Sequence, residues 1–479
     1  MRSRRSFLKQ FALGSTVLGL GGGGLLLEGC SRLAPAEGAT LPSFVPLSGR
    51  GGAQRYRLVA EVGEVEVGPG EVYRTWLYNG QFPGPEIRVR EGDVLEVEVE
   101  NRLPEGTTVH WHGLPVPNAM DGVPGLTQDP IPPGEIFLYR FTAGPAGSYL
   151  YHSHVGLQLD RGLIAPLVVE ETTPHVAYDR EYTVVLDDYL PGDPEPLTGV
   201  MMGPRMMRRR GMMGGVVTLP YRGLLVNGRL PSAPVTFEVK QGERVRFRLM
   251  NPSGATTFRV ALAGHRMWVT HTDGRPVEPY EVDSLYIAMG ERYDVVVEMN
   301  HPGAWNLMAL PVEVQAPPAR AVVRYAGVQD ADPPLRALPE GLRRGRVLNL
   351  SRLVSVELEN TAPVRPDRVF RMTLSGGMMG GRWTINGQAY PDADPLLIEE
   401  GMHVGVQMFN MSMMLHPMHL HGHFFRTGRI LKDTLTVRPH MGRGSFVFRA
   451  DNPGRWFFHC HNVYHLEAGM AREFRYTSS

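Results

Sequence analysis

A cysteine, three histidines and a methionine lie close together near the carboxyl end of the chain. His459, Cys460 and His461 are consecutive, and His465 and Met470 follow the cysteine by five and ten residues. A thiolate, imidazoles and a weak thioether form the ligand set of a mononuclear blue copper centre. Neighbouring side chains on a strand point to opposite faces, so if Cys460 faces one metal ion, His459 and His461 face away from it. The segment therefore predicts one copper site and two histidines that serve another.

Three further His-x-His pairs accompany this one. Together they give eight histidines: His110, His112, His152, His154, His419, His421, His459 and His461. Imidazole suits copper, and eight ligands divide naturally among three ions with positions left open for oxygen. A single His-x-His pair is more often a surface or zinc-binding feature, so the copper interpretation depends on how the four pairs are placed.

The elements that must position these pairs form a repeat with three copies. Each copy has an Asn-Gly turn, then a second turn with a glycine, then an alternating strand that ends in asparagine nine residues after that glycine. The turns are Asn79-Gly80, Asn227-Gly228 and Asn386-Gly387, and the strands end at Asn101, Asn251 and Asn410. Alternation with period two between such turns predicts antiparallel strands, and three copies predict three homologous β-sandwich domains.

The first and third copies carry the histidine pairs at equivalent positions, and the middle copy does not. Val260 and Leu262 occupy the places of its first pair, and Met308 and Leu310 those of its second. We therefore expect the middle domain to lack copper ligands and to act as a spacer or a substrate-shaping module.

Only the third domain is expected to build the thiolate copper centre. Its four candidate ligands are His416, Cys460, His465 and Met470, where the first domain has Thr107, Ser153, Gln158 and Leu163. The two domains are thus expected to share the eight-histidine site, with the thiolate site in the third domain alone.

These four motifs, in order along the chain, resemble those of the multicopper oxidases. Residues 119–125 and 464–470 are similar to the bacterial laccase-like branch, and particularly to periplasmic copper-resistance oxidases. The resemblance implies an all-β fold of three cupredoxin-like Greek-key β-sandwich domains. We place them at residues 45–174, 175–329 and 330–479, the boundaries lying in turn-rich stretches.

The resemblance also implies four copper ions: one type 1, one type 2 and a type 3 pair. By motif position, His110 and His419 would bind the type 2 ion. The type 3 pair would take the other six histidines: His112, His152, His154, His421, His459 and His461. Such an enzyme couples four one-electron oxidations of a donor to the reduction of O2 to two waters.

Three residues are catalytic candidates: the copper ligand Cys460 and two carboxylates outside the ligand set. Cys460 would receive electrons and pass them along the backbone to its neighbours. Asp121, eleven residues after His110, matches the acidic residue near the type 2 copper in this family, although a turn aspartate before a glycine is the alternative. In some branches of the family a glutamate directly follows the second histidine of the type 1 centre. Here Leu466 stands at that place and Glu467 comes next, so Glu467 is the candidate second proton donor.

Methionine clusters bear on the electron donor. Six lie within residues 201–213, two at 378–379, and others around His416. The first stretch is interrupted by glycine, proline and arginine, so it predicts a loop and not a core element. Thioethers favour Cu(I), which suggests a lid that offers cuprous ions to the type 1 centre. A loop that only covers the substrate pocket, or methionine as core filler near His416, is the alternative.

Three functions compete: a cuprous oxidase for copper tolerance, a dedicated laccase for phenols or aromatic amines, and a non-enzymatic copper storage or transfer protein. The last would have no use for a complete oxygen-reducing cluster. The partners expected are O2 and either Cu(I) or a small phenol. Formal net charge is +0, which removes the electrostatic case for nucleic acid. We expect a monomer, since family members often are.

The leader predicts export. Residues 1–36 contain Arg4-Arg5 and an apolar run to Leu27, which is a twin-arginine signal. The stretch before Cys30 resembles a lipobox, so the mature protein is expected in the periplasm or cell envelope, lipid-anchored at Cys30 or cleaved after Ala36. No other stretch is long and apolar enough to span a bilayer.

Overall fold

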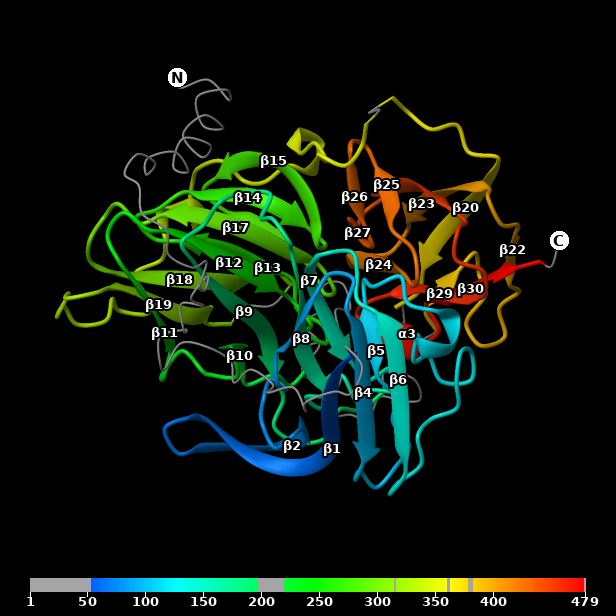
Figure 1. Cartoon of the computed structure of the whole chain (residues 1–479), viewed down its shortest axis with the longest axis horizontal. Helices are drawn as coiled ribbons and strands as arrows, with labels where there is room; N and C mark the ends of the chain where they lie inside the picture. Colours follow the sequence, from blue (N-terminus) through cyan, green and yellow to red (C-terminus); the bar gives the residue numbers. More distant parts are fainter. Residues whose placement is uncertain (1–52, 197–218, 314–315, 360–361, 378–381, 478–479) are drawn as a thin grey trace, which may run out of the picture.

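The computed structural model describes residues 53–196, 219–313, 316–359, 362–377 and 382–477. Six β-sheets form three β-sandwich domains, which confirms the predicted all-β class with three cupredoxin-like domains. In Figure 1 the first domain (blue to cyan) lies at the bottom, the second (green) at the left and the third (yellow to red) at the right. The expected export signal and the methionine-rich stretches 201–213 and 378–379 lie outside the described residues.

The first domain pairs the sheet β2-β1-β4-β6 with the sheet β3-β8-β7-β5. Its elements are β1 (Ala53–Gly68), β2 (Glu71–Tyr78), β3 (Ile87–Arg90), β4 (Val94–Asn101), β5 (His110–His112), η2 (Asn118–Met120), β6 (Ile136–Thr142), β7 (Gly147–His152) and β8 (Ile164–Glu170). Alternating residues of β4 fill its core, where Leu95, Val97 and Val99 are fully buried.

The middle domain pairs the sheet β10-β9-β12-β17-β14-β15 with the sheet β11-β19-β18-β13-β16. Its strands are β9 (Arg180–Tyr189), β10 (Gly223–Val226), β11 (Val235–Val239), β12 (Arg244–Met250), β13 (Phe258–Leu262), β14 (Met267–Thr272), β15 (Arg275–Val282), β16 (Leu285–Ile287), β17 (Arg292–Glu298), β18 (Ala304–Pro311) and β19 (Ala319–Tyr325). Two 3-10 helices, η3 (Glu340–Leu342) and η4 (Leu350–Arg352), follow in the connection to the third domain.

The third domain pairs the sheet β21-β20-β23-β28-β25-β26 with the sheet β22-β30-β29-β24-β27. Its elements are β20 (Arg368–Ser375), β21 (Thr384–Ile385), β22 (Leu396–Ile398), β23 (His403–Asn410), β24 (His416–Leu420), β25 (Phe425–Thr427), β26 (Ile430–Lys432), β27 (Thr434–Val437), β28 (Arg443–Arg449), β29 (Arg455–Cys460), α3 (Val463–Glu467) and β30 (Ala471–Tyr476).

The sheets are mixed, so the expectation of antiparallel strands was incomplete. Most pairs are antiparallel, but each of the six sheets contains one parallel pair. Period-two alternation cannot reveal this, because it reports which face is buried and not the direction of the neighbouring strand.

The threefold repeat has a structural basis in its turn asparagines. Asn79, Asn227 and Asn386 all have positive φ, at 52°, 49° and 56°. Asparagine tolerates this region because its short side chain can bond locally to the backbone. Each Oδ1 accepts a hydrogen bond from a backbone amide of an adjacent strand, at 2.6, 2.7 and 2.7 Å. The repeated Asn-Gly turns therefore position the same pair of strands in all three domains.

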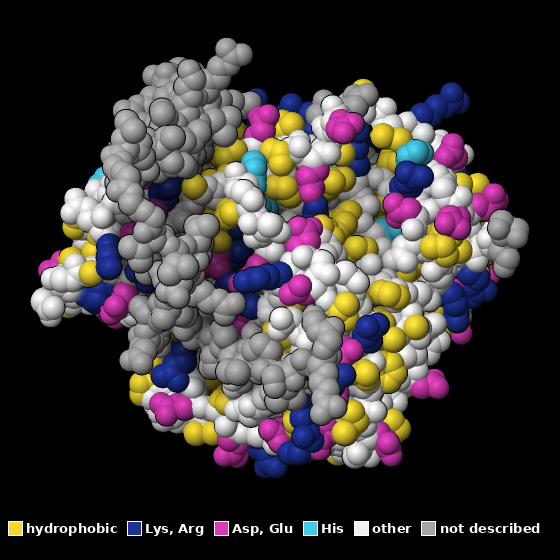
Figure 2. Space-filling view, viewed as in Figure 1, with side chains coloured by type: hydrophobic (Ala, Val, Ile, Leu, Met, Phe, Trp, Pro, Cys, Tyr) yellow, Lys and Arg dark blue, Asp and Glu magenta, His cyan; other side chains and the backbone are white. Residues whose placement is uncertain are grey.

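Charges of both signs are mixed on one face of the molecule (Figure 2), and the described helices are short. On the face that Figure 2 shows, basic and acidic side chains are interspersed without a large patch of one sign. Among the described residues, no helix is both long and apolar enough to cross a membrane.

Candidate metal centres

The thiolate group assembles from two strands and a helix of the third domain. Cys460 ends β29, His416 begins β24 and His465 lies in α3. The Cys460 Sγ is 3.5 Å from Nδ1 of His416 and 3.5 Å from Nδ1 of His465, and these two nitrogens are 3.2 Å apart. All three side chains are buried. A cysteine sulfur and two imidazoles that converge on one point offer the trigonal ligand set of blue copper sites; burial raises the pKa of the Cys460 thiol, so the thiolate would form as metal binds.

Local structure explains how His465 and Met470 come to lie close to Cys460. Asn462 caps α3, and its side chain accepts hydrogen bonds from the amides of Tyr464 and His465. The short helix reverses the chain, so that the Cys460 amide donates to the Met470 carbonyl at 3.0 Å. Met470 is fully buried in the same core cluster as Cys460. The structure thus brings all four predicted residues of the type 1 centre into one region.

Two neighbours hold the imidazoles of this group. Nε2 of His416 is 2.7 Å from Oγ of Ser412, which leaves Nδ1 directed at the thiolate. The Trp383 ring packs on His465 with centroids 4.0 Å apart. Burial lowers the pKa of His416 to about 3, so its imidazole is neutral near pH 7 and has a free lone pair.

The eight remaining predicted ligands meet where the first and third domains touch. In the first domain β5 pairs with β7, and His110 lies opposite His152; in the third β24 pairs with β29, and His419 lies opposite His459. Across the domains, the rings of His110 and His421 stack at 3.9 Å. Three groups have ring nitrogens within 4.8 Å of one another: His110, His419 and His421; His110, His112 and His152; His154, His421 and His459.

His461 completes the set beside the first domain. Its Nε2 is 3.2 Å from Nδ1 of His112. All eight predicted histidines are therefore part of one buried assembly, and the described part of the middle domain adds no member to the candidate metal groups.

Unpartnered ring nitrogens show that this assembly fits a metal. Four are buried without a hydrogen-bond partner: Nε2 of His110, His152 and His419, and Nδ1 of His461. In the first three, Nδ1 donates to a backbone carbonyl at 2.8, 2.9 and 3.0 Å, which leaves the lone pair on Nε2. A buried lone pair without a partner is unfavourable, and such second hydrogen bonds are typical of metal-binding histidines. The imidazole donor set suits copper.

Electrostatics keep these imidazoles neutral. Burial, reinforced by His110, lowers the pKa of His152 to about 3. Burial is also the largest cause that holds the pKa of five other histidines well below the usual range: His112, His154, His421, His459 and His461. Neutral imidazole is the form that binds metals.

The two predicted proton donors occupy different environments. Asp121 is fully buried, and its Oδ2 accepts a hydrogen bond from Nδ1 of His421 at 3.0 Å. Glu467 ends α3 with an exposed side chain and belongs to none of the candidate metal groups of the described chain. His423, another histidine near the cluster ligands, bonds to Tyr476 Oη at 2.8 Å and to a backbone carbonyl.

Sequence reasoning missed one buried carboxylate, Asp433. Its Oδ1 is 3.3 Å from Nε2 of His112 and 3.4 Å from Nδ1 of His419. Burial opposes ionisation, but Arg292 holds the pKa of Asp433 well below its usual range. No motif marks this aspartate. The available signal was a charged pair, Lys432-Asp433, inside an otherwise apolar strand segment.

Comparison with known families decides what this arrangement belongs to. Three family models, each described as multicopper oxidase, match residues 60–174, 180–328 and 362–479. The chain belongs to the multicopper oxidase family. It is therefore an oxidoreductase that uses O2, and its buried histidine clusters are consistent with the multicopper sites of that family.

Individual multicopper oxidases match over nearly the whole chain. Multicopper oxidase MmcO of Mycobacterium tuberculosis is 37% identical over 506 residues, covering 99% of this chain and 97% of that protein. A copper resistance protein A homolog of Pseudomonas syringae pv. tomato is 29% identical over 597 residues, covering 99% of each. The crystal structure of a multi-copper oxidase from Pseudomonas thermotolerans has a TM-score of 0.67 and 30% identity, covering 89% of this chain and 99% of that one.

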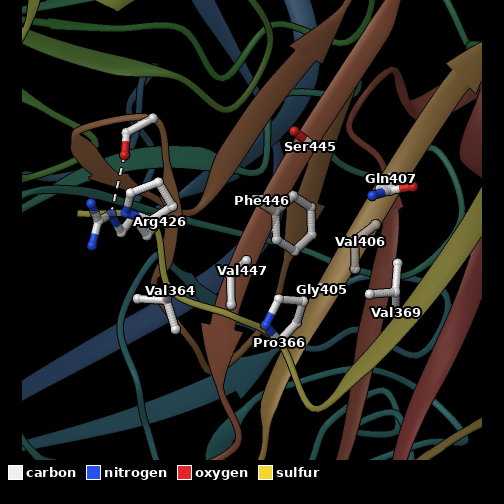
Figure 3. A pocket seen from close by; sticks show the side chains of 12 residues that line it. Val364, Pro366, Val369, Gly405, Val406, Gln407, Arg426, Ser445, Phe446 and Val447 are labelled. Atoms are coloured by element: carbon white, nitrogen blue, oxygen red, sulfur yellow. Dashed lines mark hydrogen bonds between the residues drawn. The ribbon is translucent and has the colours of Figure 1, made fainter. Parts of the chain in front are cut away.

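A surface pocket of this multicopper oxidase is lined by none of the candidate copper ligands. It lies against the sheet of β23, β25 and β28, and Figure 3 shows Val364, Pro366 and Phe446 around it. Its lining contains no histidine, cysteine, methionine or carboxylate. The pocket therefore offers none of the side chains that the metal centres use.

Proposed function

We propose that this multicopper oxidase binds four copper ions and oxidises Cu(I) with O2. The type 1 ion would lie among His416, Cys460, His465 and Met470, and the other three among the eight histidines. Four Cu(I) would become four Cu(II) while O2 and four protons become two waters. The observation that carries the proposal is the continuity between the two centres, because Cys460 ends β29 directly between His459 on that strand and His461 just after it.

The chain's own atoms provide a short path between the centres. Bound copper would supply one-electron redox chemistry and O2 reduction. From the Cys460 Sγ, the path follows the backbone in both directions to the flanking histidines. A hydrogen bond shortens one branch, since Nδ1 of His459 donates to the Cys460 carbonyl oxygen at 3.0 Å. This bond also directs Nε2 of His459 toward His421, 3.0 Å away.

Asp121 would assist proton delivery on the oxygen side. It is the predicted carboxylate that the structure buries against the cluster, and it contacts histidines of both domains. In this position it can accept a proton or hold one close to where water forms, and a carboxylate in hydrogen-bond reach is the arrangement that proton transfer requires.

Exposed methionines support Cu(I) as the donor. Met411, Met413 and Met441 are 60%, 58% and 61% exposed. The first two flank Ser412, whose hydroxyl contacts His416, and the Met441 amide donates to Asn410 at 2.9 Å, which places both loops together. Thioethers are soft donors that prefer Cu(I). The copper resistance names of several relatives support the same assignment.

Two sets of variants test this function. Cys460→Ser should abolish both the blue colour and turnover, whereas oxidase activity that survives would overturn the copper assignment. The triple variant Met411→Leu, Met413→Leu, Met441→Leu keeps side-chain volume but removes soft donors. We expect its kcat/KM for Cu(I) to fall roughly tenfold, with that for 2,6-dimethoxyphenol unchanged.

Deletion of residues 201–213 tests the methionine-rich stretch in the same two assays. We expect a larger loss of kcat/KM with Cu(I) than with the phenol; Cu(I) oxidation that stays intact after the deletion would refute the hypothesis of a copper-handling lid. No turnover with either donor by the wild-type, copper-loaded protein would favour storage or transfer of copper.

We also propose that the enzyme is exported by the twin-arginine route and acts in the cell envelope as a monomer. Replacing Arg4 and Arg5 by lysine should retain the protein in the cytoplasm on fractionation. Cys30→Ala separates the two leader hypotheses, because only a lipoprotein would then lose its membrane association. Light scattering of the purified enzyme tests the monomer.

A further inference from the structure

The middle domain reaches the histidine cluster through the turn between β16 and β17, residues 288–292. Gly290 has a φ of +82° and lies directly against two cluster histidines. A Cβ at this position would be 2.8 Å from Cδ2 of His461 and 3.0 Å from Cε1 of His112. Only a residue without a side chain allows the backbone to approach these two rings so closely.

Arg292, which ends the same turn, forms a bidentate ion pair across the domain boundary. Its Nη1 donates to Oδ1 of Asp433 at 2.8 Å and its Nη2 to Oδ2 at 2.6 Å. The guanidinium is completely buried, and it also donates to the carbonyls of Ser148 in β7 and of Gly290. A planar fork held by four acceptors fixes the carboxylate in one orientation.

That orientation matters because Asp433 faces cluster histidines from both domains. Its backbone carbonyl accepts from Nδ1 of His419 at 3.0 Å, and its Oδ1 is 3.3 Å from Nε2 of His112. The hydroxyl of Thr434 donates to the same Oδ1 at 2.8 Å. Arg292 therefore acts on two rings without touching either of them.

A second ion pair anchors this segment of the third domain to the middle domain. The Lys432 ammonium is 3.0 Å from Oδ2 of Asp273 and 3.2 Å from Oε1 of Glu291. The same Asp273 oxygen accepts from the backbone amides of Asp433 and Thr434, at 3.3 and 3.2 Å. The middle domain thus binds both the side chain of Lys432 and the backbone amides of Asp433 and Thr434, next to the histidines that Asp433 contacts.

The first domain leaves room for this arrangement. Gly113 directly follows His112, with a φ of +88°. A Cβ there would collide with Nη2 of Arg292 and would lie 2.6 Å from Oδ2 of Asp433. The glycine after the first histidine pair therefore admits an ion pair formed by the two other domains.

We propose that residues 288–292 of the middle domain are a positioning element of the three-copper site. Gly290 sets the packing of His112 and His461, and Arg292 holds Asp433 against His112 and His419. The inference rests on the proposed assignment of the eight histidines as copper ligands. It gives the middle domain a role in the oxygen-reducing centre although it supplies no ligand.

A matched pair of glycine variants tests the packing. Gly290→Ala places an alanine in a left-handed backbone conformation, and its methyl group meets the rings of His112 and His461. Gly242→Ala places an alanine in the same kind of conformation, at a φ of +87°, but its methyl group has nothing within 4 Å. We expect both variants to lose thermal stability as apo-proteins, and Gly290→Ala to lose more because only its methyl group meets buried rings. Only Gly290→Ala should show a changed near-ultraviolet absorption of the type 3 pair and roughly tenfold faster loss of copper to a chelator, with the blue absorption retained. Identical behaviour of the two variants would overturn the proposal.

Arginine variants test the ion pair independently of the turn. Arg292→Met should alter the type 2 signal and lower kcat with an unchanged KM for the donor; Arg292→Lys, which keeps the charge, should restore part of both. Arg248→Met is the control, because Arg248 is an equally buried, ion-paired arginine of the same domain that contacts Ser148 but not Asp433. Equal spectral effects of Arg292→Met and Arg248→Met would show a merely structural role. Wild-type enzyme that binds only the blue copper would instead refute the ligand assignment itself.

Discussion

Asp121 of the first domain accepts a hydrogen bond from His421 of the third, with 3.0 Å between Oδ2 and Nδ1. Its backbone carbonyl accepts from Nδ1 of His110 at 2.8 Å. One residue thus orients two histidines that come from different domains and stack on each other at 3.9 Å. The Asp121 carboxylate also lies 3.3 Å from Nδ1 of His110, but the shorter bond to that ring comes from the main chain, so a substitution can remove the partner of His421 and keep that of His110.

Asp121→Ala should therefore release His421 while His110 keeps its carbonyl partner. Substitution of residues that hold metal ligands typically lowers activity or metal affinity 10- to 100-fold, and we expect a decrease in kcat of about that size. Asp121→Asn should lose less, because its amide oxygen can still accept from His421. Stopped-flow spectroscopy checks this: reduction of the blue centre should keep its rate, and reoxidation by O2 should slow. Asp129→Asn, an exposed site in the same domain, is the control.

Ser412→Ala should weaken the type 1 centre selectively. The variant removes the oxygen that lies 2.7 Å from Nε2 of His416, so the ring loses the bond that directs Nδ1 to the thiolate. We expect roughly tenfold weaker retention of the blue copper and a shifted absorption band, with the type 2 signal unchanged. Ser375→Ala removes a hydroxyl of the same domain that bonds to Thr384. If both variants keep the wild-type spectrum, Ser412 does not position His416.

Asp188→Asn should stabilise the protein in alkali and not in acid. Burial, with smaller contributions from Asp160 and Glu313, raises the pKa of Asp188 to about 7. The pKa of Asp188 is higher in the folded protein than in the unfolded chain. The contribution of this carboxyl to stability is therefore complete in acid and is lost as the pH rises from about 4 to about 7. At pH 8 the amide should gain on the order of 4 kcal/mol over wild type.

Thermal unfolding of the apo-proteins between pH 4 and pH 8 measures this difference. The gap between the melting temperatures of Asp188→Asn and wild type should close toward pH 4. Glu135→Gln, which removes one exposed carboxylate, should show no such dependence. A gap that is constant with pH would mean that the substitution acts through packing and not through the charge.

Asp294→Ala should destabilise the contact between the first and middle domains. Its carboxylate accepts from Ser148 of the first domain at 2.7 Å and pairs with Arg246 and Arg248 at 2.5 and 3.2 Å. Removing it leaves buried positive charges undercompensated, which typically costs about 3 kcal/mol or more. Asp179→Ala removes a half-exposed partner of Arg244 at 3.6 Å and should cost under about 1 kcal/mol. Urea unfolding of the apo-proteins separates the two, and equal losses would contradict the burial argument.

The histidine pairs could be predicted because their places on the strands follow from local pattern. The Asn-Gly turns recur with constant spacing, and each pair keeps its distance from the end of an alternating strand. Register then places His110 opposite His152 and His419 opposite His459. Spacing alone was also enough to separate Cys460 from its first-domain counterpart Ser153.

What surrounds the ligands depends on packing between distant segments, which spacing does not report. Asp433, Gly290 and Arg292 belong to no repeated motif, and they meet only after the middle and third domains have docked. The middle domain lacks histidine pairs, so its sequence predicted a spacer or a substrate-shaping module and concealed its contact with the cluster. The bonds from Nδ1 to backbone carbonyls were equally invisible, since every residue carries a carbonyl.

The eight-histidine assembly draws half of its members from the first domain and half from the third. Neither end of the chain can close the site alone, and the middle domain must already lie between them. During synthesis, the histidines of the first domain can therefore complete the assembly only after the last strands of the third domain have left the ribosome. Copper loading at the proposed site would then report complete translation and domain docking, which a truncated chain could not achieve.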